Sequence, residues 1–262
     1  LKISHINSQS ILNKIDEFRF IFEKSGIDII CVSETWLKPE MNDISVTLAG
    51  YNVVRVDRGS HGGGVAIYIK KGIKFNEICR SSQNDNIEYL FLEITSNKKK
   101  LCLGSVYRPN RNINCEEFRL IIEGFLSGYE KVIIAGDFNA NLLTDSTIPD
   151  LFDPLGLSSA NKTIPTHFTS SCSTLLDLFL VDDLSKVLLY QQLSASCFSK
   201  HDLIFMIYDF FTQTLDQIIT YRDFSKLNYE RLSESCNVIE WDRIYYLLTV
   251  DERVAFLEEN LV

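Results

Sequence analysis

The strongest constraint on the fold is a long series of short apolar runs, most of which have the pattern of β-strands. The runs are rich in Val, Ile and aromatic residues and are bounded by Gly, Asn or Lys turns, at 1–7, 28–36, 51–56, 64–70, 73–79, 87–94, 101–107, 132–135, 176–181 and 203–209. Helical spacing of apolar residues predicts helices only at 11–24 and 115–126 before residue 211. Because helices interrupt groups of strands, the order predicts an α/β fold in which two sheets pack together and helices lie outside.

The run VIIAGDFNAN at 132–141 indicates where a site could form. Val132 to Ala135 read as a central strand covered on both faces, and Asp137 and Asn139 follow at its carboxyl end. Alternation along a strand would direct both polar side chains to one surface and Phe138 to the core. An Asx-stabilised turn is the simpler alternative for this pair.

Other apolar strands also end in one polar side chain suited to a metal or a phosphate. Asn7, Glu34 and Tyr107 each close a strand, Asp177 lies within LLDLFL, and His201 precedes the last strand. Each residue alone also has a structural explanation, such as a helix cap, a half-buried aromatic ring, an ion pair or a loop. A carboxylate inside an apolar run is costly to bury unpaired, so Asp177 is expected to have a partner, for which an imidazole is well suited.

Composition excludes several classes of protein. The 262 residues are 45% hydrophobic, which suits one large globular domain with or without an appendage. Seven cysteines are an odd number without the close pairing of zinc sites, which predicts a reduced, intracellular chain. The chain has neither a run of ~18 apolar residues nor a signal peptide, so we expect a soluble protein with no membrane partner. Because Leu1 stands in place of an initiator Met, a fragment of a longer polypeptide is expected.

Charge is distributed unevenly along the chain. The net charge is −9, and residues 211–262 contribute ten acidic against five basic residues, which argues against binding of nucleic acid by an overall basic surface. The pattern after residue 210 becomes helical, so a boundary is predicted near 211, with 211–262 as a helical linker or extension. Two lysine groups could contact phosphates or could be solvated strand ends: Lys70, Lys71, Lys74 and Lys98, Lys99, Lys100.

Eight motifs, in this order, carry a resemblance to a known family: HINSQS, SETW, GGGVAIYIKK, YRPN, GDFNAN, PTHF, LLDLFL and SKHDLI. Over residues 1–210 the chain resembles the apurinic-type endonuclease domain of non-LTR (LINE-type) retrotransposons, in the endonuclease/exonuclease/phosphatase superfamily. The resemblance implies an α/β four-layer sandwich of two packed mixed β-sheets flanked by helices. It also implies a nuclear enzyme that nicks double-stranded DNA, with a downstream reverse transcriptase in the same polyprotein.

The resemblance implies a role for each polar residue at the strand ends. Glu34, helped by Asn7, would bind Mg²⁺, with Mn²⁺ as a possible substitute, because hard oxygen ligands suit these ions. Asp137 would orient or deprotonate the attacking water, and Asn139 would hold the scissile phosphate. His201, positioned by Asp177, would stabilise charge or move a proton, and Tyr107 would contact the phosphate or the leaving oxygen. The residues expected to touch the DNA backbone are Arg108, Asn110, Thr166 and His167.

Two residues depart from the family pattern. Lys200 stands where relatives commonly have Asp, which could weaken metal handling, and Asp202 is not expected to replace that acid because neighbouring strand residues face opposite ways. Gln9 stands where repair relatives have Asp, which favours a retroelement enzyme. HGGG at 61–64 resembles an esterase loop, but no G-x-S-x-G is present, and we expect its glycines to form a tight entry into a hairpin.

Two other functions remain open from the sequence. The same metal site could serve a phosphatase or phosphodiesterase acting on inositol phosphates or lipids. Alternatively, the chain could be a catalytically decayed retroelement copy, for which Lys200 is the best argument.

Overall fold

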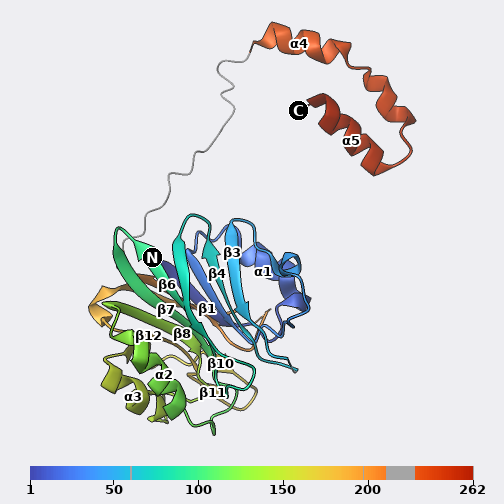
Figure 1. Cartoon of the computed structure of the whole chain (residues 1–262). Helices are drawn as coiled ribbons and strands as arrows, with labels where there is room; N and C mark the ends of the chain where they lie inside the picture. Colours follow the sequence, from blue (N-terminus) through green and yellow to red (C-terminus); the bar gives the residue numbers. More distant parts are fainter. Residues whose placement is uncertain (60, 197, 211–227, 262) are drawn as a thin grey trace. The chain divides into compact units, whose positions relative to one another are not determined.

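The computed structural model describes residues 1–59, 61–196, 198–210 and 228–261 (Figure 1). The chain divides into two compact units, Leu1–Leu215 and Asp216–Val262. The boundary predicted near residue 211 lies outside the described residues. Among the residues described, no helix has the length and apolar character needed to cross a membrane.

The second unit is helical where it is described. Its elements are α4 (Tyr229–Val238), the 3₁₀ helix η6 (Trp241–Tyr246) and α5 (Val250–Leu261). Within this unit the ring of Trp241 lies edge-on to that of Phe256, with centroids 6.4 Å apart.

The first unit contains two six-stranded mixed sheets. The first sheet has the order β13 (Val187–Leu193), β14 (Leu203–Tyr208), β1 (Lys2–Asn7), β2 (Ile29–Ser33), β4 (Val65–Lys70), β3 (Tyr51–Val56). The second has the order β5 (Lys74–Arg80), β6 (Glu88–Ser96), β7 (Lys99–Tyr107), β8 (Lys131–Asp137), β12 (Asp177–Val181), β9 (Ser158–Ser159). A separate pair is formed by β10 (His167–Phe168) and β11 (Ser173–Thr174).

The two sheets pack face to face and helices cover their outer faces, which gives four layers (Figure 1). The core between the two sheets is mainly aliphatic, with residues such as Ile29 and Ile133 fully buried. Phe18 and Phe22 of α1 (Ile15–Phe22) pack on the outer face of the first sheet. The outer face of the second sheet is covered by α2 (Glu116–Leu126) and α3 (Thr147–Phe152). The predicted fold class is confirmed.

Strand register places the polar strand ends at one edge of the sandwich. β1 runs parallel to β2, and β7 runs parallel to β8, so the carboxyl ends of these strands lie side by side within each sheet. β12 is antiparallel to β8 with Asp177 opposite Asp137, so the amino end of β12 reaches the same edge. The topology therefore gathers residues from far apart in the sequence.

The strands that sequence reasoning did not predict are exposed or very short. β13 is an edge strand that contains no fully buried residue, and a register shift after Val187 leaves two neighbouring leucines exposed, so its sequence VLLYQQL lacks both a buried run and a strict alternation. β9, β10 and β11 have two residues each, below the length at which periodicity is visible. The predicted helix at 11–24 is present as a 3₁₀ turn, η1 (Leu12–Lys14), followed by α1.

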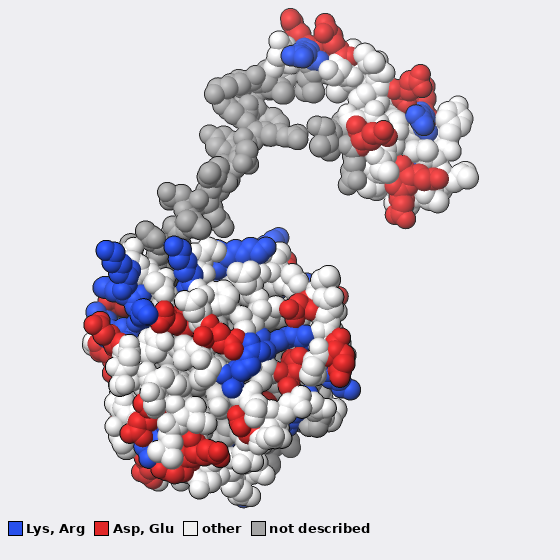
Figure 2. All heavy atoms as spheres, in the orientation of Figure 1, with Lys and Arg blue, Asp and Glu red and all other residues white. Residues whose placement is uncertain are grey.

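Both lysine groups lie at the end of the sandwich opposite these polar strand ends. Lys70 ends β4, whose first residue pairs with the last residue of β2, and Lys99 begins β7, which ends at Tyr107. Figure 2 shows basic side chains along this end, where the N-terminus also lies in Figure 1. These lysines are therefore not placed to contact a phosphate at the site edge.

The glycines of the HGGG motif belong to the connection between β3 and β4. Gly62, Gly63 and Gly64 have φ of +80°, +69° and +88°, a region that favours glycine. A Cβ on Gly64 would lie 2.4 Å from Thr35 Oγ1. The motif thus allows this hairpin entry to approach the loop after β2, as expected.

Candidate active site

Asn7 joins two acids that come from different sheets. Its Nδ2 donates to Glu34 Oε1 at 2.9 Å and to Asp137 Oδ2 at 2.8 Å, while its Oδ1 accepts from the backbone N–H of Gln9 at 3.1 Å. Asn7 and Asp137 are almost fully buried, where polar groups are kept only when paired. The structure therefore brings Asn7, Glu34 and Asp137 together.

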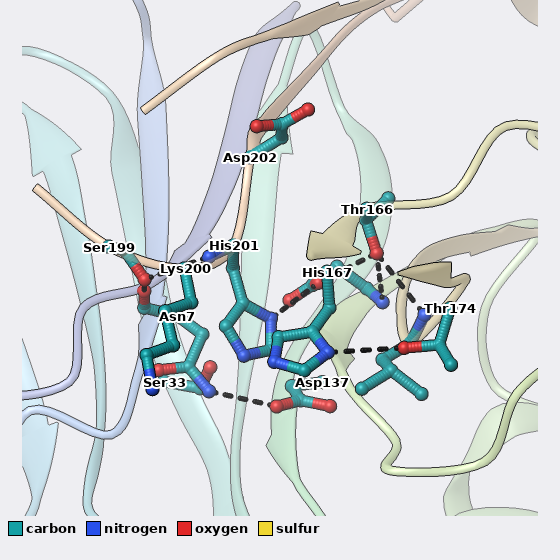
Figure 3. A network of polar contacts seen from close by, with 12 residues as sticks. Asn7, Ser33, Asp137, Thr166, His167, Thr174, Ser199, Lys200, His201 and Asp202 are labelled. Atoms are coloured by element: carbon teal, nitrogen blue, oxygen red, sulfur yellow. Dashed lines mark hydrogen bonds and ion pairs between the residues drawn. The ribbon is translucent and has the colours of Figure 1, made fainter. Parts of the chain in front are cut away.

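Asp177 and His201 form a buried ion pair next to Asp137. Figure 3 shows His201 and Asp137 within this polar network. His201 Nδ1 lies 2.8 Å from Asp177 Oδ2, and Thr166 Oγ1 donates to the same oxygen at 2.8 Å. Asp177 and His201 are 0% and 4% exposed. The partner expected for Asp177 from its apolar surroundings is thus an imidazole.

Burial and mutual charge shift the pKa values of this group. Burial raises the pKa of Asp137 to about 7, and the nearby Asp177 carboxylate adds to the rise. Burial also opposes ionisation of Asp177, but His201 and Thr166 hold the pKa of that carboxyl below its ordinary value. Burial disfavours an imidazolium, yet the Asp177 carboxylate raises the pKa of His201 to about 9. Near neutral pH the site thus pairs an anion and a cation beside a carboxyl group poised to exchange a proton.

The raised pKa of His201 predicts a pH-dependent contribution to stability. The contribution is fully present below the unfolded-state pKa of about 6.5 and is lost as pH rises through about 9. In EDTA, the excess unfolding free energy of wild type over His201→Gln should fall by up to about 3 kcal/mol between pH 6 and pH 10. Urea unfolding at several pH values measures this difference, and a pH-independent difference would contradict the charged pair.

Tyr107 lies beside Glu34 at the mouth of the site. Burial, together with the Glu34 carboxylate, raises the pKa of Tyr107, so its phenol keeps the proton. The guanidinium carbon of Arg58 lies 5.9 Å from the centroid of the tyrosine ring. Glu34 also accepts from Trp36 Nε1 at 3.1 Å, through its second oxygen. Both oxygens of Glu34 are therefore oriented by neighbouring donors.

The model of the Endonuclease/Exonuclease/phosphatase family matches residues 6–199, a range that includes Asn7, Glu34, Asp137 and Asp177. The chain belongs to this family. Members of the family are metal-dependent hydrolases that act on phosphodiester bonds. None of the curated proteins matches the chain.

Three solved structures illustrate the shared fold. The AP endonuclease LMAP from Leishmania major has a TM-score of 0.66 and 14% identity, over 78% of this chain and 86% of that one. The 3′ phosphatase NExo from Neisseria, bound to a product DNA hairpin, has a TM-score of 0.64 and 14% identity, over 80% and 100%. The endonuclease domain of TRAS1, a telomere-specific non-LTR retrotransposon, has a TM-score of 0.61 and 16% identity, over 78% and 96%.

Two groups of residues could hold the divalent ion that the family uses. Asp137, Asp177 and His201 offer ligand atoms within 4.8 Å of one another, but a protonated His201 bonded to Asp177 would repel a cation. Glu34 is partly exposed and points towards Asp137 through their shared donor Asn7, which gives carboxylate oxygens suited to a hard cation. Of the two groups, the one that contains the Glu34 carboxylate therefore fits a divalent cation better. Asn7 turns its amide nitrogen towards both acids, so in this arrangement it positions them and does not offer its oxygen.

Asn139 differs from its expected geometry. β8 ends at Asp137, and Asn139 has φ of +47°, so the alternation of a strand does not extend to it. Its backbone N–H donates to Asp137 Oδ1 at 2.9 Å, which is the Asx turn considered from the sequence, and its Nδ2 donates to the carbonyl of Arg108 at 2.7 Å. Phe138 is buried in the core as predicted. The turn thus fixes the Asp137 carboxylate as well as the chain direction.

Two of the four predicted DNA contacts are buried. Thr166 is 0% exposed and bonded to Asp177, and Arg108 is 3% exposed with its guanidinium on the backbone carbonyls of Ile113 and Phe138. In this structure the polar side-chain atoms of these two residues therefore serve the fold, and their contact with the DNA backbone stays a prediction. Asn110 is exposed, and the half-buried ring of His167 lies 4.5 Å from that of His201.

Thr166 is expected to act on the site through Asp177. Its hydroxyl donates to Asp177 Oδ2 and accepts from the backbone N–H groups of Leu176 and Asp177 at 3.1 and 3.0 Å. Thr166→Val should lower the unfolding free energy by about 1–3 kcal/mol, because three buried groups lose a partner. Thr166→Ser keeps the hydroxyl and should cost less than about half of that. Chemical denaturation of the two variants measures the contrast, and equal losses would indicate that only packing matters.

The residues that depart from the family pattern lie at the rim. Lys200 is exposed, and its backbone N–H faces Gln9 Oε1 at 3.5 Å. The Asp202 carboxylate accepts from Gln192 Nε2 at 2.8 Å and points away from His201 (Figure 3), so it does not replace the missing acid. Ser199 donates to the carbonyl of Asn7 at 2.6 Å and holds the segment before His201 against β1.

Sequence reasoning missed three residues of the site: His5, Trp36 and Ser199. His5 is fully buried and lies two residues before Asn7, on the same face of β1. The alternation of Ile3, His5 and Asn7 along the strand could have indicated that His5 faces the site. Trp36 and Ser199 belong to the quoted motifs but contact the site through atoms that only the loop conformation brings near.

Proposed function

We propose that residues 1–210 form a Mg²⁺-dependent endonuclease of a non-LTR retrotransposon, which nicks one strand of double-stranded DNA. The cut would leave a 3′-hydroxyl that primes reverse transcription. The observation that carries the proposal is the convergence of Glu34, Asp137 and the Asp177–His201 pair at one edge of a family fold. The likeness to the TRAS1 endonuclease domain and to a DNA-bound 3′ phosphatase supports DNA as the substrate.

The chain's own residues supply the proton transfers and charge stabilisation that phosphodiester hydrolysis needs. A water oxygen forms a bond to phosphorus, the bond between phosphorus and the 3′-oxygen breaks, and that oxygen gains a proton. Asp137, with a pKa raised to about 7, suits acceptance of the water proton. His201 as imidazolium and Tyr107 as neutral phenol suit donation to phosphate oxygens. Asn139 would orient the phosphate.

A divalent ion would be held mainly by Glu34, next to Asn7 and Asp137. When bound, it supplies neutralisation of charge on the phosphate oxygens. Mg²⁺ is the proposed ion and Mn²⁺ a substitute, because the candidate ligands are carboxylate oxygens. The DNA duplex is the proposed partner, together with a downstream reverse transcriptase joined through 211–262, and the proposed location is the nucleus.

The experiment is nicking of supercoiled plasmid by the purified chain in Mg²⁺, with EDTA and His201→Ala as controls. Metal-dependent nicks whose 3′ ends a DNA polymerase extends directly would support the proposal. Nicks that need 3′ repair before extension would contradict the priming role. A folded protein that cuts no DNA but hydrolyses inositol phosphates would move the assignment to the phosphatase branch, and one inert on both would indicate a decayed copy.

A further inference from the structure

His5 is a fully buried imidazole that none of the proposed catalytic steps uses. It lies on the face of β1 that points between the sheets, with its Nδ1 3.6 Å from Asp177 Oδ1 and its Nε2 3.2 Å from Ser33 Oγ. Asp177 therefore has imidazoles on two sides, His201 at one oxygen and His5 at the other.

The two atoms that face each other at this 3.6 Å distance, His5 Nδ1 and Asp177 Oδ1, form no hydrogen bonds to the described residues. Both atoms are buried. A buried orphan donor or acceptor is unfavourable, so two of them aimed at each other indicate an interaction that a small movement completes. Ser33 Oγ–H can donate to His5 Nε2, which leaves the ring proton on Nδ1, directed at Asp177.

We propose that His5 is a positioning residue whose neutral Nδ1–H tautomer donates to Asp177 Oδ1. This donor fixes the rotation of the Asp177 carboxylate about its side chain, so that Oδ2 stays directed at His201 and Thr166. The activity readout below rests on the proposed nicking function, whereas the tautomer readout does not.

The tautomer is measured directly by NMR of wild-type protein with ¹⁵N-labelled histidine, in EDTA. His5 should show a protonated Nδ1 and an unprotonated Nε2, with the signal assigned by its absence in His5→Leu. A protonated Nε2 on His5 would overturn the proposal even if the protein never nicks DNA.

Activity separates positioning from packing. His5→Leu should lower kcat about tenfold with KM unchanged, because Asp177 loses one oriented donor. His5→Asn places an amide N–H near the position of Nδ1 and should recover kcat to within about threefold of wild type. Equal kcat for His5→Leu and wild type, or for His5→Asn and His5→Leu, would show that His5 only fills space.

A separate observation concerns the lysines at the end of the sandwich opposite the site. Lys74 pairs with Thr95, which pairs with Lys100, so the β4–β5 turn and the β6–β7 hairpin bring the two lysine groups together. Among the described residues, Lys100 has an ion pair with Glu93, whereas the remaining members form none: Lys70, Lys71, Lys74, Lys98 and Lys99.

The β6–β7 hairpin keeps a lysine where glycine would fit better. Its two turn residues, Asn97 and Lys98, have φ of +49° and +65°, as in a type I′ turn, and the second position of that turn favours glycine. A lysine held in a left-handed conformation at the tip is a steric cost that a merely solvated turn would avoid.

We infer that this lysine surface, Lys70, Lys71, Lys74, Lys98 and Lys99, binds the phosphate backbone of a nucleic acid at a second site. Several unpaired cations on the β4–β5 turn and the adjacent β6–β7 hairpin fit a polyanion, and phosphate contacts need no base-reading element. The surface lies away from Glu34 and His201, so it would hold a strand other than the one being cut.

The test compares Lys71→Gln/Lys74→Gln/Lys98→Gly/Lys99→Gln with Lys38→Gln/Lys162→Gln, which removes exposed lysines elsewhere. Fluorescence anisotropy of a labelled 30-bp duplex in EDTA gives the slope of log K against log salt, which should fall in magnitude by about 3 to 4 only in the quadruple variant. The kcat of the quadruple variant at saturating plasmid should stay unchanged. The single substitution Lys98→Gly should raise the melting temperature of the protein. An unchanged slope, or loss of binding to phosphatidylserine vesicles and not to DNA, would overturn the inference while leaving the nicking function intact.

Discussion

Replacing Glu34 with Gln is expected to lower plasmid nicking by about 10³-fold or more, the largest effect of any change at the metal position. The substitution keeps the size of the side chain but removes the negative charge of the carboxylate that Asn7 and Trp36 orient. In the proposed mechanism a divalent ion would then lose its principal anionic ligand, and charge on the scissile phosphate would no longer be neutralised. Calorimetric Mg²⁺ titration of the same variant should show loss of the binding heat.

Glu40→Gln is the matched control, because Glu40 is an exposed acid a few residues further along the loop after β2. It should retain Mg²⁺ binding and nicking within about twofold of wild type, as expected for a surface change. If Glu34→Gln retained both properties, the ion would have to be held by Asp137, Asp177 and His201. Mg²⁺ titration of His201→Gln would then test that second position.

Much of the fold could be predicted because its strands are long and buried on both faces. The run at 132–135 is apolar throughout, the run at 176–181 is apolar except for Asp177, and the strands at 51–56 and 101–107 end close to where the structure ends them. β13 could not be predicted because an edge strand need not bury either face, and its exposed leucines carry no periodic signal. The two-residue strands depend on contacts between distant loops, which a local pattern does not encode.

The sequence predicted which strand-end residues lie together at the candidate site, but it did not predict the hydrogen bonds that hold them. The rule that polar residues end buried strands located Asn7, Glu34 and Asp137, and the cost of burying an acid indicated a partner for Asp177. The bonds of Thr166 and Arg108 could not be foreseen, since both lie in loops whose side chains turn inward only after the sheets assemble. Alternation along β1 could have placed His5 between the sheets, but its partner Asp177 could not be foreseen, because the pattern of one strand does not show which residue of the other sheet lies opposite.

Replacing Asp177 with Asn is the second change expected to have a large effect. The amide keeps the shape of the side chain but removes the charge that raises the pKa of His201 to about 9, so the imidazole loses its proton near neutral pH. Nicking should fall by about 10²- to 10⁴-fold, the range seen when an acid that orients a catalytic histidine is neutralised. The ratio of rates at pH 6 and pH 8, measured on supercoiled plasmid, should rise in this variant because only low pH then protonates His201.

The dependence of His201 on Asp177 makes a double substitution decisive. If the two act as one unit, Asp177→Asn/His201→Gln should nick about as slowly as the slower single variant, whereas independent residues would multiply their losses. The losses of unfolding free energy should also be less than additive in the double variant. Removing one member of a buried ion pair costs about 3–5 kcal/mol, and removing the second member adds less. Asp183→Asn removes the charge that faces Lys131 but keeps a side-chain oxygen that can accept from Ser185, so it should change stability little and leave nicking unchanged. Additive losses in the double variant would mean that Asp177 holds the loop before β14 and that His201 works without it.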